Sequence, residues 1–296
     1  MGYNLATMRI AHISDFHYTR LTANPLRLFS KRLMGHVNWL FARKHNFSEE
    51  ILEPLPTLFQ ELGVDLVLLG GDLTTTALLE EFEVANRFVK KLKTPWIAIP
   101  GNHDTYTYNS HRNRHFYRYF TNKRPSISHP VDFFTLKDHQ IEAYRLFDGT
   151  WLVALDVSRA TNLYSSRGLF SEKQEERLIE ILSLIPATDS ILLLCHYPFF
   201  QNDQWRRNLE RGDALQALLE NEPRIRLFLH GHTHRRTMAD LQPSGLPIVL
   251  DSGSCAQLGR ASWNLIDINS SGCKVDVYRW LDKWNCIEEQ EFTWKR

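Results

Sequence analysis

Residues 65–72 read Asp-Leu-Val-Leu-Leu-Gly-Gly-Asp, an apolar run that ends in two glycines and an aspartate. The run predicts a short buried strand over 65–70, because a few apolar residues bounded by turn residues are typical of one. Four more apolar runs end in the same way, with metal-ligating side chains directly after the strand. These expected strands are 8–14, 95–100, 190–195 and 225–229, followed by Asp15-Phe16-His17, Gly101-Asn102-His103-Asp104, His196 and Gly231-His232-Thr233-His234.

Five strands that each end in such side chains predict one shared site. In an open α/β sheet, ligands bind in the crevice outside the carboxyl ends of the strands. Taken singly, each motif has an ordinary explanation: Gly71-Asp72 is good turn chemistry, and His196 alone fits a hydrogen-bonded interior histidine. Because the strand context and the ligand chemistry agree across all five motifs, the set favours a common site.

The remaining pattern indicates sheets covered by helices. Helical spacing of apolar residues predicts helices over 48–62, 78–92, 171–185 and 213–220. Further strands are expected at 131–136, 141–146 and 150–155, and then, with no more helices, at 248–250, 262–268 and 274–280. Strands that alternate with helices and then continue alone are typical of an α/β fold. Without a repeat or a low-complexity linker, we expect one domain over residues 1–296.

Composition excludes several classes of protein. The chain is 43% hydrophobic and 23% charged, which fits a folded core, and its net charge of +1 gives no overall field for nucleic acid or membrane. No apolar run approaches the roughly 18 residues of a membrane-spanning helix. No signal peptide is evident, and the four cysteines lack Cys-x-x-Cys spacing. We therefore expect a cytoplasmic protein with reduced thiols, with peripheral membrane association as the alternative.

The five motifs, which span residues 15–234, resemble the signature of the calcineurin-like metallophosphoesterase superfamily. They are most similar to its bacterial members that include class III cyclic-nucleotide phosphodiesterases. The resemblance implies a four-layer α/β/β/α sandwich of two mixed β-sheets flanked by helices. It also implies two divalent metal ions. The first would be bound by Asp15, His17, Asp72 and His234, and the second by the same Asp72 with Asn102, His196 and His232.

The chemistry of these side chains fits that implication. Carboxylate, amide and imidazole ligands suit Mn, Fe, Co, Ni or Zn, and the absence of thiolates argues against a structural zinc site. We expect Mn or Fe, with Zn, Co or Ni as alternatives. In the family pattern, His103 would serve the leaving-group oxygen as proton donor or charge stabiliser. Asp104 would orient His103 or hold its charged form, with turn capping as the alternative.

Two basic stretches lie outside the motifs. Between Asp15 and Glu49 there is no acidic residue, and basic residues interleave there with apolar ones at helical spacing. This pattern predicts a basic amphipathic cap insert at about 18–48. Three roles remain open for it: a packed helix with a solvated face, contact with anionic lipid, or phosphate steering. Its basic residues are Arg20, Arg27, Lys31, Arg32, Arg43 and Lys44, and its apolar ones are Leu26, Phe29, Leu33, Val37, Leu40 and Phe41.

The second basic stretch, over 111–124, carries four aromatic residues among its charges. Substrate phosphate binding, base stacking and a solvated helix are all compatible with this composition. The aromatic residues are Phe116, Tyr117, Tyr119 and Phe120.

We expect an enzyme that hydrolyses a small-molecule phosphoester, and most specifically a phosphodiesterase acting on a nucleotide-type substrate. One alternative is a UDP-2,3-diacylglucosamine pyrophosphatase at the membrane surface. One branch of that activity carries Arg where this chain has His103, whereas a second branch keeps His. An alternative of another class is a non-catalytic scaffold, as in the retromer scaffold subunit. Such scaffolds usually lack the histidine or a metal ligand, and all are present here. An oligomer through the tryptophan-rich segment after 246 remains open.

Overall fold

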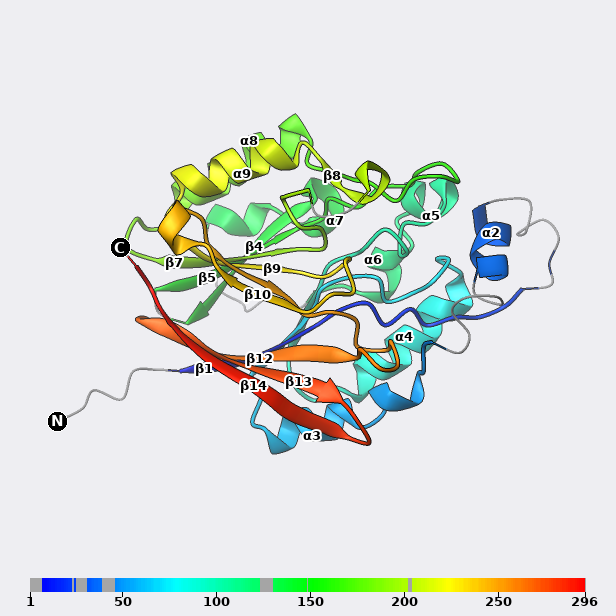
Figure 1. Cartoon of the computed structure of the whole chain (residues 1–296). Helices are drawn as coiled ribbons and strands as arrows, with labels where there is room; N and C mark the ends of the chain where they lie inside the picture. The colour runs from blue at the N-terminus through cyan, green and yellow to red at the C-terminus, as the bar shows by residue number, and fades with distance from the viewer. Residues whose placement is uncertain are drawn as a thin grey trace.

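The computed structural model describes residues 7–22, 24, 31–38, 46–122, 130–147, 149–201 and 204–295. Within them, two six-stranded sheets lie face to face (Figure 1). The first has the order β14-β13-β12-β1-β2-β3, and the second β10-β11-β9-β7-β5-β4. Each sheet contains both parallel and antiparallel pairs.

The bounds of the strands and helices are as follows. The first sheet holds β1 (Met8–Ile13), β2 (Leu66–Leu69), β3 (Trp96–Ala98), β12 (Ser262–Asn269), β13 (Gly272–Trp280) and β14 (Trp284–Thr293). The second holds β4 (Ile141–Phe147), β5 (Thr150–Leu155), β7 (Ser190–Cys195), β9 (Ile225–His230), β10 (Thr237–Asp240) and β11 (Ile248–Asp251). Two short strands, β6 (Gly168–Leu169) and β8 (Leu209–Glu210), pair with each other. The helices are α2 (Lys31–Asn38), α3 (Leu55–Glu61), α4 (Leu79–Lys91), α5 (Tyr108–Arg112), α6 (Phe116–Tyr119), α7 (Leu136–His139), α8 (Glu172–Leu184) and α9 (Gly212–Asn221).

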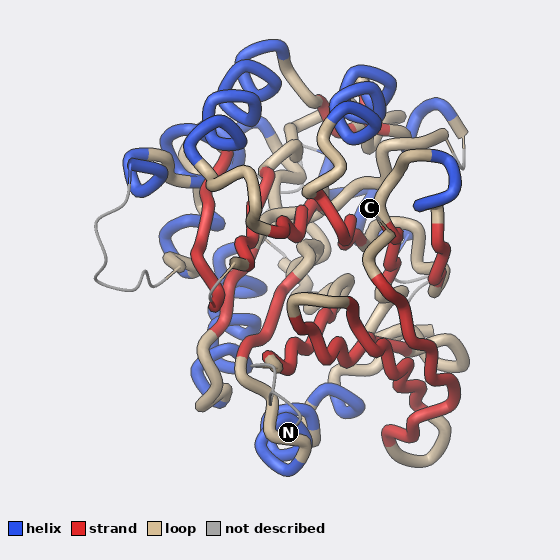
Figure 2. The backbone as a smooth tube through the Cα atoms, turned by 90° about the vertical axis from the view of Figure 1, so that its left-hand side faces the viewer, coloured by secondary structure: helices blue, strands red, loops and turns tan. Residues whose placement is uncertain are grey.

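Helices cover the outer face of each sheet. Helices α3 and α4 lie beneath the first sheet, and α8 and α9 lie above the second (Figure 1). Figure 2, turned by 90°, shows the same stack of helices, strands, strands and helices. This arrangement confirms the predicted four-layer α/β/β/α sandwich. The single domain over 1–296 stays a prediction.

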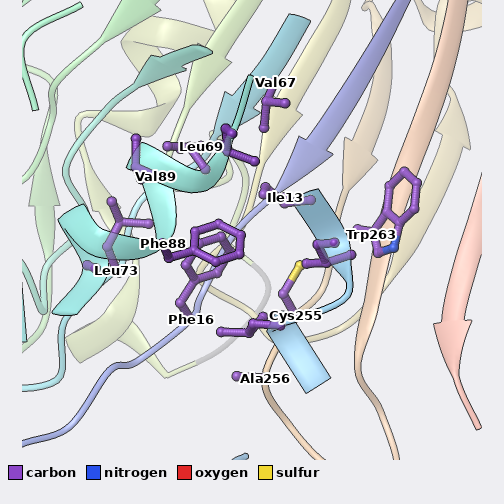
Figure 3. Close-up of a cluster of buried hydrophobic side chains, with 14 of the residues drawn as sticks. Ile13, Phe16, Val67, Leu69, Leu73, Phe88, Val89, Cys255, Ala256 and Trp263 are labelled. Atoms are coloured by element: carbon purple, nitrogen blue, oxygen red, sulfur yellow. The ribbon is translucent and has the colours of Figure 1, made fainter. Parts of the chain in front are cut away.

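The continuous apolar runs arise because the central strands are buried on both faces. In β2, Val67 and Leu69 join the cluster beneath the first sheet, together with Phe88 of α4 (Figure 3). The alternate residues of the same strand, Leu66 and Leu68, belong to the core between the two sheets. Successive side chains of a strand point to opposite faces, so one apolar run supplies two layers of core.

Most predicted elements are confirmed to within two residues, but the strand predicted at 131–136 is wrong. Residues Pro130–Phe133 form a 3₁₀ helix, and α7 begins at Leu136. Thr135 is the N-cap of this helix: its Oγ1 accepts a hydrogen bond from Asp138 N at 3.1 Å, so the chain turns into a helix here and does not continue as a strand. A short apolar run does not distinguish a buried strand from a buried helical turn.

The helix predicted over 48–62 is divided. A 3₁₀ turn, Glu50–Leu52, precedes α3, which has Pro54 at its N-cap and Pro56 in its first turn. Proline has no backbone N–H, so a continuous helix through these positions would lose hydrogen bonds. Strands β10 and β14 were not predicted from the sequence.

The described part of the cap insert consists of residues 18–22, 24, 31–38 and 46–48, including α2. Arg20 pairs with Glu49 at 2.7 Å, and the buried Arg32 donates to the carbonyl oxygens of Thr76 and Ala77 at 3.0 and 2.8 Å. The partners of these two basic side chains are thus intramolecular, neither lipid nor substrate phosphate. The other predicted members lie outside the described residues: Leu26, Arg27, Phe29, Leu40, Phe41, Arg43 and Lys44.

The second basic stretch is anchored in the core. Phe116 and Phe120 are buried in the cluster beneath the first sheet, so they are not available to stack on a substrate base. The Tyr117 hydroxyl donates to Asp156 Oδ2 at 2.6 Å. In the described segments, no helix has both the length and the apolar character needed to cross a membrane.

A substitution in the core between the sheets tests this packing. Leu194 is fully buried in β7, and Leu194→Ala should lower the free energy of unfolding by about 2–5 kcal/mol, through lost burial and a residual cavity. Leu281 is 61% exposed, so Leu281→Ala should change it by less than about 0.5 kcal/mol. Urea denaturation followed by circular dichroism measures both. Equal effects of the two substitutions would contradict the burial of Leu194.

Candidate metal centre

The motifs that follow β1, β2, β7 and β9 lie close together, because these strands are arranged with their carboxyl ends on the same side. Strands β1 and β2 are parallel neighbours, and so are β7 and β9. Backbone bonds tie the loops that follow: Asp15 N donates to Gly71 O at 3.0 Å, and Gly231 N to His196 O at 3.1 Å. His232 N donates to Asp15 Oδ2 at 3.1 Å and so joins the loops of the two sheets.

The described residues contain several groups of potential metal ligands, and two of the buried ones flank Asp72. In the first, the Asp15 Oδ1 atom lies 3.0 Å from His234 Nε2 and 3.6 Å from His17 Nε2. In the second, Asp72 is grouped with His196 and His232. Asp72 Oδ2 lies 3.4 Å from His196 Nε2 and 4.0 Å from His17 Nε2, so one carboxylate faces both clusters.

Contacts inside the clusters fit bound cations. The Nε2 atoms of His17 and His234 lie 3.0 Å apart. Asn102 Oδ1 is buried and has no hydrogen-bond partner among the described residues. A buried polar atom is normally paired, and a cation beside these lone pairs would satisfy them. The donor set of oxygen and imidazole nitrogen therefore fits a dimetal site.

Carbonyl oxygens fix which nitrogen of two imidazoles carries the proton. His196 Nδ1 lies 2.7 Å from Gly70 O, and His232 Nε2 lies 2.8 Å from Arg207 O. A carbonyl oxygen only accepts, so these two nitrogens donate. In the neutral rings, the lone pair is thereby placed on His196 Nε2, which faces Asp72, and on His232 Nδ1. Such outer contacts orient metal-binding histidines.

Electrostatics keep both buried carboxylates ionised. Burial alone would raise the pKa of Asp15 and Asp72, but neighbouring imidazoles outweigh it, chiefly His234 at Asp15 and His196 at Asp72. The pKa of each carboxyl is therefore held below its ordinary value. Burial lowers the pKa of His196, yet the charge of Asp72 raises it overall to about 10. Both carboxylates are therefore ionised at neutral pH.

Five of the clustered residues adopt left-handed backbone conformations, which residues other than glycine rarely adopt. Each such conformation costs on the order of 1–3 kcal/mol, and such residues gather at functional sites. The sequence carries no signal for this feature. The φ angles are 58° at Asp15, 52° at His17, 54° at Asp72, 69° at His232 and 55° at His234.

Two motif glycines are required by close approach. A Cβ atom on Gly231 would lie 2.5 Å from Asp15 Oδ2 and would also overlap Ser14. A Cβ atom on Gly101 would overlap the Asp72 carboxylate. Both glycines therefore pack directly against the carboxylates of the centre, where no larger residue fits.

His103 forms a further group of potential ligands with His17 and Asp72, and its ring is fixed. Its backbone N donates to Asp72 Oδ1 at 2.7 Å, and its Nδ1 lies 2.6 Å from Thr75 O. The ring stacks on Tyr106, with centroids 5.5 Å apart and planes at 16°. Because Thr75 O accepts, the proton of the neutral ring is on Nδ1, and Nε2 carries a second proton only in the charged form.

Asp104 is buried behind His103. It accepts hydrogen bonds from Gly101 N at 3.0 Å, Thr74 N at 2.9 Å and Leu73 N at 3.2 Å. Burial and the charge of Asp72 raise its pKa to about 7. These contacts brace the loops after β2 and β3 against each other and, through Gly101, hold the loop that carries His103.

A cavity of about 570 Å³ opens over the centre, and its walls are cationic. Asp72, Asn102, His103, His232 and His234 line its floor. Lys31, from the predicted cap insert, lines the same cavity. The sequence motifs did not indicate the other basic residues, although the pairs Arg206-Arg207 and Arg235-Arg236 are basic dipeptides near ligands in the sequence. The missed cations of the lining are Arg206, Arg207, Arg235 and Arg260.

Solved structures share this architecture. A dimetal phosphatase from Danio rerio superposes with a TM-score of 0.68 at 14% identity, covering 97% of this chain and 99% of its own. A purple acid phosphatase from yellow lupin (Lupinus luteus) seeds superposes with a TM-score of 0.65 at 11% identity, covering 98% of this chain and 54% of its own. At these identities the likeness shows the fold alone.

Curated relatives are more similar in sequence. A 3′,5′-cyclic-nucleotide phosphodiesterase of Nostoc sp. is 25% identical over 229 residues, 76% of this chain and 71% of the relative. The glycerophosphodiester phosphodiesterase GpdQ of Enterobacter lignolyticus is 25% identical over 234 residues, 78% of this chain and 72% of the relative. The calcineurin-like phosphoesterase model matches residues 8–236, which include all five motifs. The chain therefore belongs to the calcineurin-like phosphoesterase family.

Proposed function

We propose that this phosphoesterase is a two-metal phosphodiesterase that acts on a nucleotide-type substrate. The observation that carries the proposal is the Asp72 carboxylate, which faces both ligand clusters at the floor of a cationic cavity. The curated relatives include phosphodiesterases of cyclic nucleotides and of glycerophosphodiesters, which supports a diester as substrate.

The proposed ligand set is that of the two clusters with Asn102 added. Asp15, His17, Asp72 and His234 would hold one cation, and Asp72, Asn102, His196 and His232 the other. We favour Mn or Fe among the metals that a donor set of oxygen and imidazole suits. Two bound divalent cations would lower the pKa of the attacking water and neutralise charge on the phosphoryl oxygens.

The protein side chains would then complete the reaction. His103 Nδ1 is held by Thr75 O, so Nε2 of the charged ring donates a proton to the leaving-group oxygen. Asp104 acts as a positioning residue, since it fixes Gly101 and the loop that carries His103. The arginines of the cavity wall attract the anionic substrate and bind its phosphate oxygens.

A second candidate is a UDP-2,3-diacylglucosamine pyrophosphatase at the membrane surface. It is favoured by Lys31 of the basic insert, which joins four arginines around one cavity and gives charge enough for two phosphate groups. Assays with cyclic nucleotides, dinucleotides and UDP-2,3-diacylglucosamine, each with Mn²⁺, separate the two. Preference for the lipid nucleotide together with sedimentation on anionic vesicles would favour this candidate; cyclic-nucleotide turnover without vesicle binding would exclude it.

Removing the proposed proton donor should separate catalysis from metal binding. His103→Ala should lower kcat on a 3′,5′-cyclic nucleotide by about 10²–10⁴-fold, because its alkoxide leaving group needs the proton that is lost. The metal content should remain unchanged, since His103 is outside the proposed ligand set. Steady-state kinetics and elemental analysis of the same samples measure both. Activity within twofold of the native enzyme would disprove the role of His103.

Filling the space at a motif glycine should instead remove the metal. Gly231→Ala would push a methyl group against Asp15, and metal affinity should fall at least about tenfold, as when second-sphere contacts are lost. Gly245→Ala is the control: its positive φ of 77° strains the backbone, which is not the case at Gly231, but nothing lies within 4 Å of the added methyl group. Equilibrium dialysis with Mn²⁺ compares them. Native affinity in Gly231→Ala would contradict the packing of this loop on Asp15.

A further inference from the structure

A second cavity, of about 530 Å³, opens beside the metal centre. We call it the annex. It shares Lys31, Tyr106, Leu163 and Tyr164 with the cavity over the metal centre, so the two spaces adjoin along these residues. A molecule with its phosphorus over Asp72 would thus have a substituent close to the annex.

The walls of the annex are apolar and unusually exposed. Tyr108 is 67% exposed, Tyr164 73% and Leu163 49%. Single apolar residues on a surface are ordinary, but three gathered around one cavity are typical of a binding site. The rings of these tyrosines and the Leu163 side chain offer area to an apolar group.

Three of the polar side chains that line the annex already accept hydrogen bonds from within the protein. Thr107 Oγ1 accepts from Ser110 N at 3.1 Å, and Asn162 Oδ1 accepts from Tyr164 N at 3.2 Å. Thr161 Oγ1 accepts from Lys31 Nζ at 2.9 Å. A nucleobase has several donors and acceptors, and three of the acceptors that this lining could offer are already in use. An alkyl or aryl group has none to satisfy.

Lys31 marks the boundary between the annex and the metal cavity. Its ammonium lies 2.9 Å from Thr161 Oγ1 and 2.9 Å from Ser165 O, and 4.6 Å from the centroid of the Tyr106 ring. Two of its three donors are used in these bonds. The charge of Asp72 acts on this ammonium and opposes the effect of burial, which lowers the pKa of Lys31 to about 8.

Helix α2 is held firmly enough to keep Lys31 there. The neighbouring Arg32 is buried and bonded to two backbone carbonyls. A Cβ atom on Gly35 would lie 2.7 Å from Thr76 Cγ2, so the helix packs directly on the loop after β2. The ammonium is therefore a fixed feature of the cavity wall.

We infer that the annex binds an apolar ester group of the substrate while Lys31 binds an oxygen of the phosphate that carries it. The substrate class is a phosphodiester with one alkyl or aryl arm. This inference rests on the proposed phosphodiesterase activity, with the polar arm of the substrate left to the arginine-lined side of the metal cavity.

Diesters that differ only in one arm test the inference. Methyl p-nitrophenyl phosphate and hexyl p-nitrophenyl phosphate share a leaving group, and each methylene buried in the annex strengthens binding. We expect kcat/KM of the Mn²⁺-loaded enzyme to be at least tenfold higher for the hexyl ester. Leu163→Ser should reduce this hexyl-to-methyl ratio to below threefold. Ile179→Ser, which alters an apolar residue of similar exposure on α8, should leave the ratio unchanged.

Each outcome separates the inference from the activity on which it rests. Metal-dependent hydrolysis of both esters with a ratio below two would overturn the annex and leave the phosphodiesterase proposal intact. If neither ester is hydrolysed, the proposed phosphodiesterase activity is wrong. The annex would still be supported if calorimetry showed that hexyl phosphate binds more tightly than methyl phosphate and if Leu163→Ser abolished the difference. A thymidine p-nitrophenyl phosphate could also be cleaved with a higher kcat/KM than the methyl ester. If Leu163→Ser removed that difference, the annex would bind a nucleoside, and the inference would be wrong.

Discussion

The position of the Asp72 carboxylate is the constraint on which the rest of the site depends. It is buried, ionised and within 4.0 Å of an imidazole from each ligand cluster. A buried charge is costly unless it is compensated, and here histidines from both sheets and the backbone N–H of His103 provide the compensation. The two sheets are therefore joined at their carboxyl edge by electrostatics as well as by the apolar core. Bound cations would complete that balance.

The fold accommodates this concentration of charge through local backbone geometry. Five clustered residues take left-handed conformations, and glycines lie where a side chain would strike a carboxylate. The strain is tolerated because the strands that precede these loops are buried on both faces and fixed in register. The same rigidity places α2 and Lys31 at the wall of the cavity, so substrate contacts and metal ligands share one scaffold.

The sequence predicted the central strands because burial on both faces leaves a continuous apolar run. It predicted the metal-ligand motifs because the side chains that bind metals are recognisable from residue type alone. It misassigned 131–136, where Thr135 caps a helix that a short apolar run does not reveal. It also missed Arg206, Arg260 and the annex. Those features depend on loops brought together by the fold, and neither periodicity nor motif spacing records such proximity. The left-handed backbone at Asp72 was equally invisible.

Electron paramagnetic resonance of the protein loaded with two equivalents of Mn²⁺ tests the shared carboxylate most directly. Two ions bridged by Asp72 should be magnetically coupled, and they should lie about 3.5–4 Å apart, as in other two-metal sites. The expected spectrum is that of a coupled pair, with a stoichiometry of about two ions per chain by elemental analysis. Spectra of isolated Mn²⁺ ions alone at that loading, or saturation at one ion per chain, would contradict a dimetal centre built on Asp72.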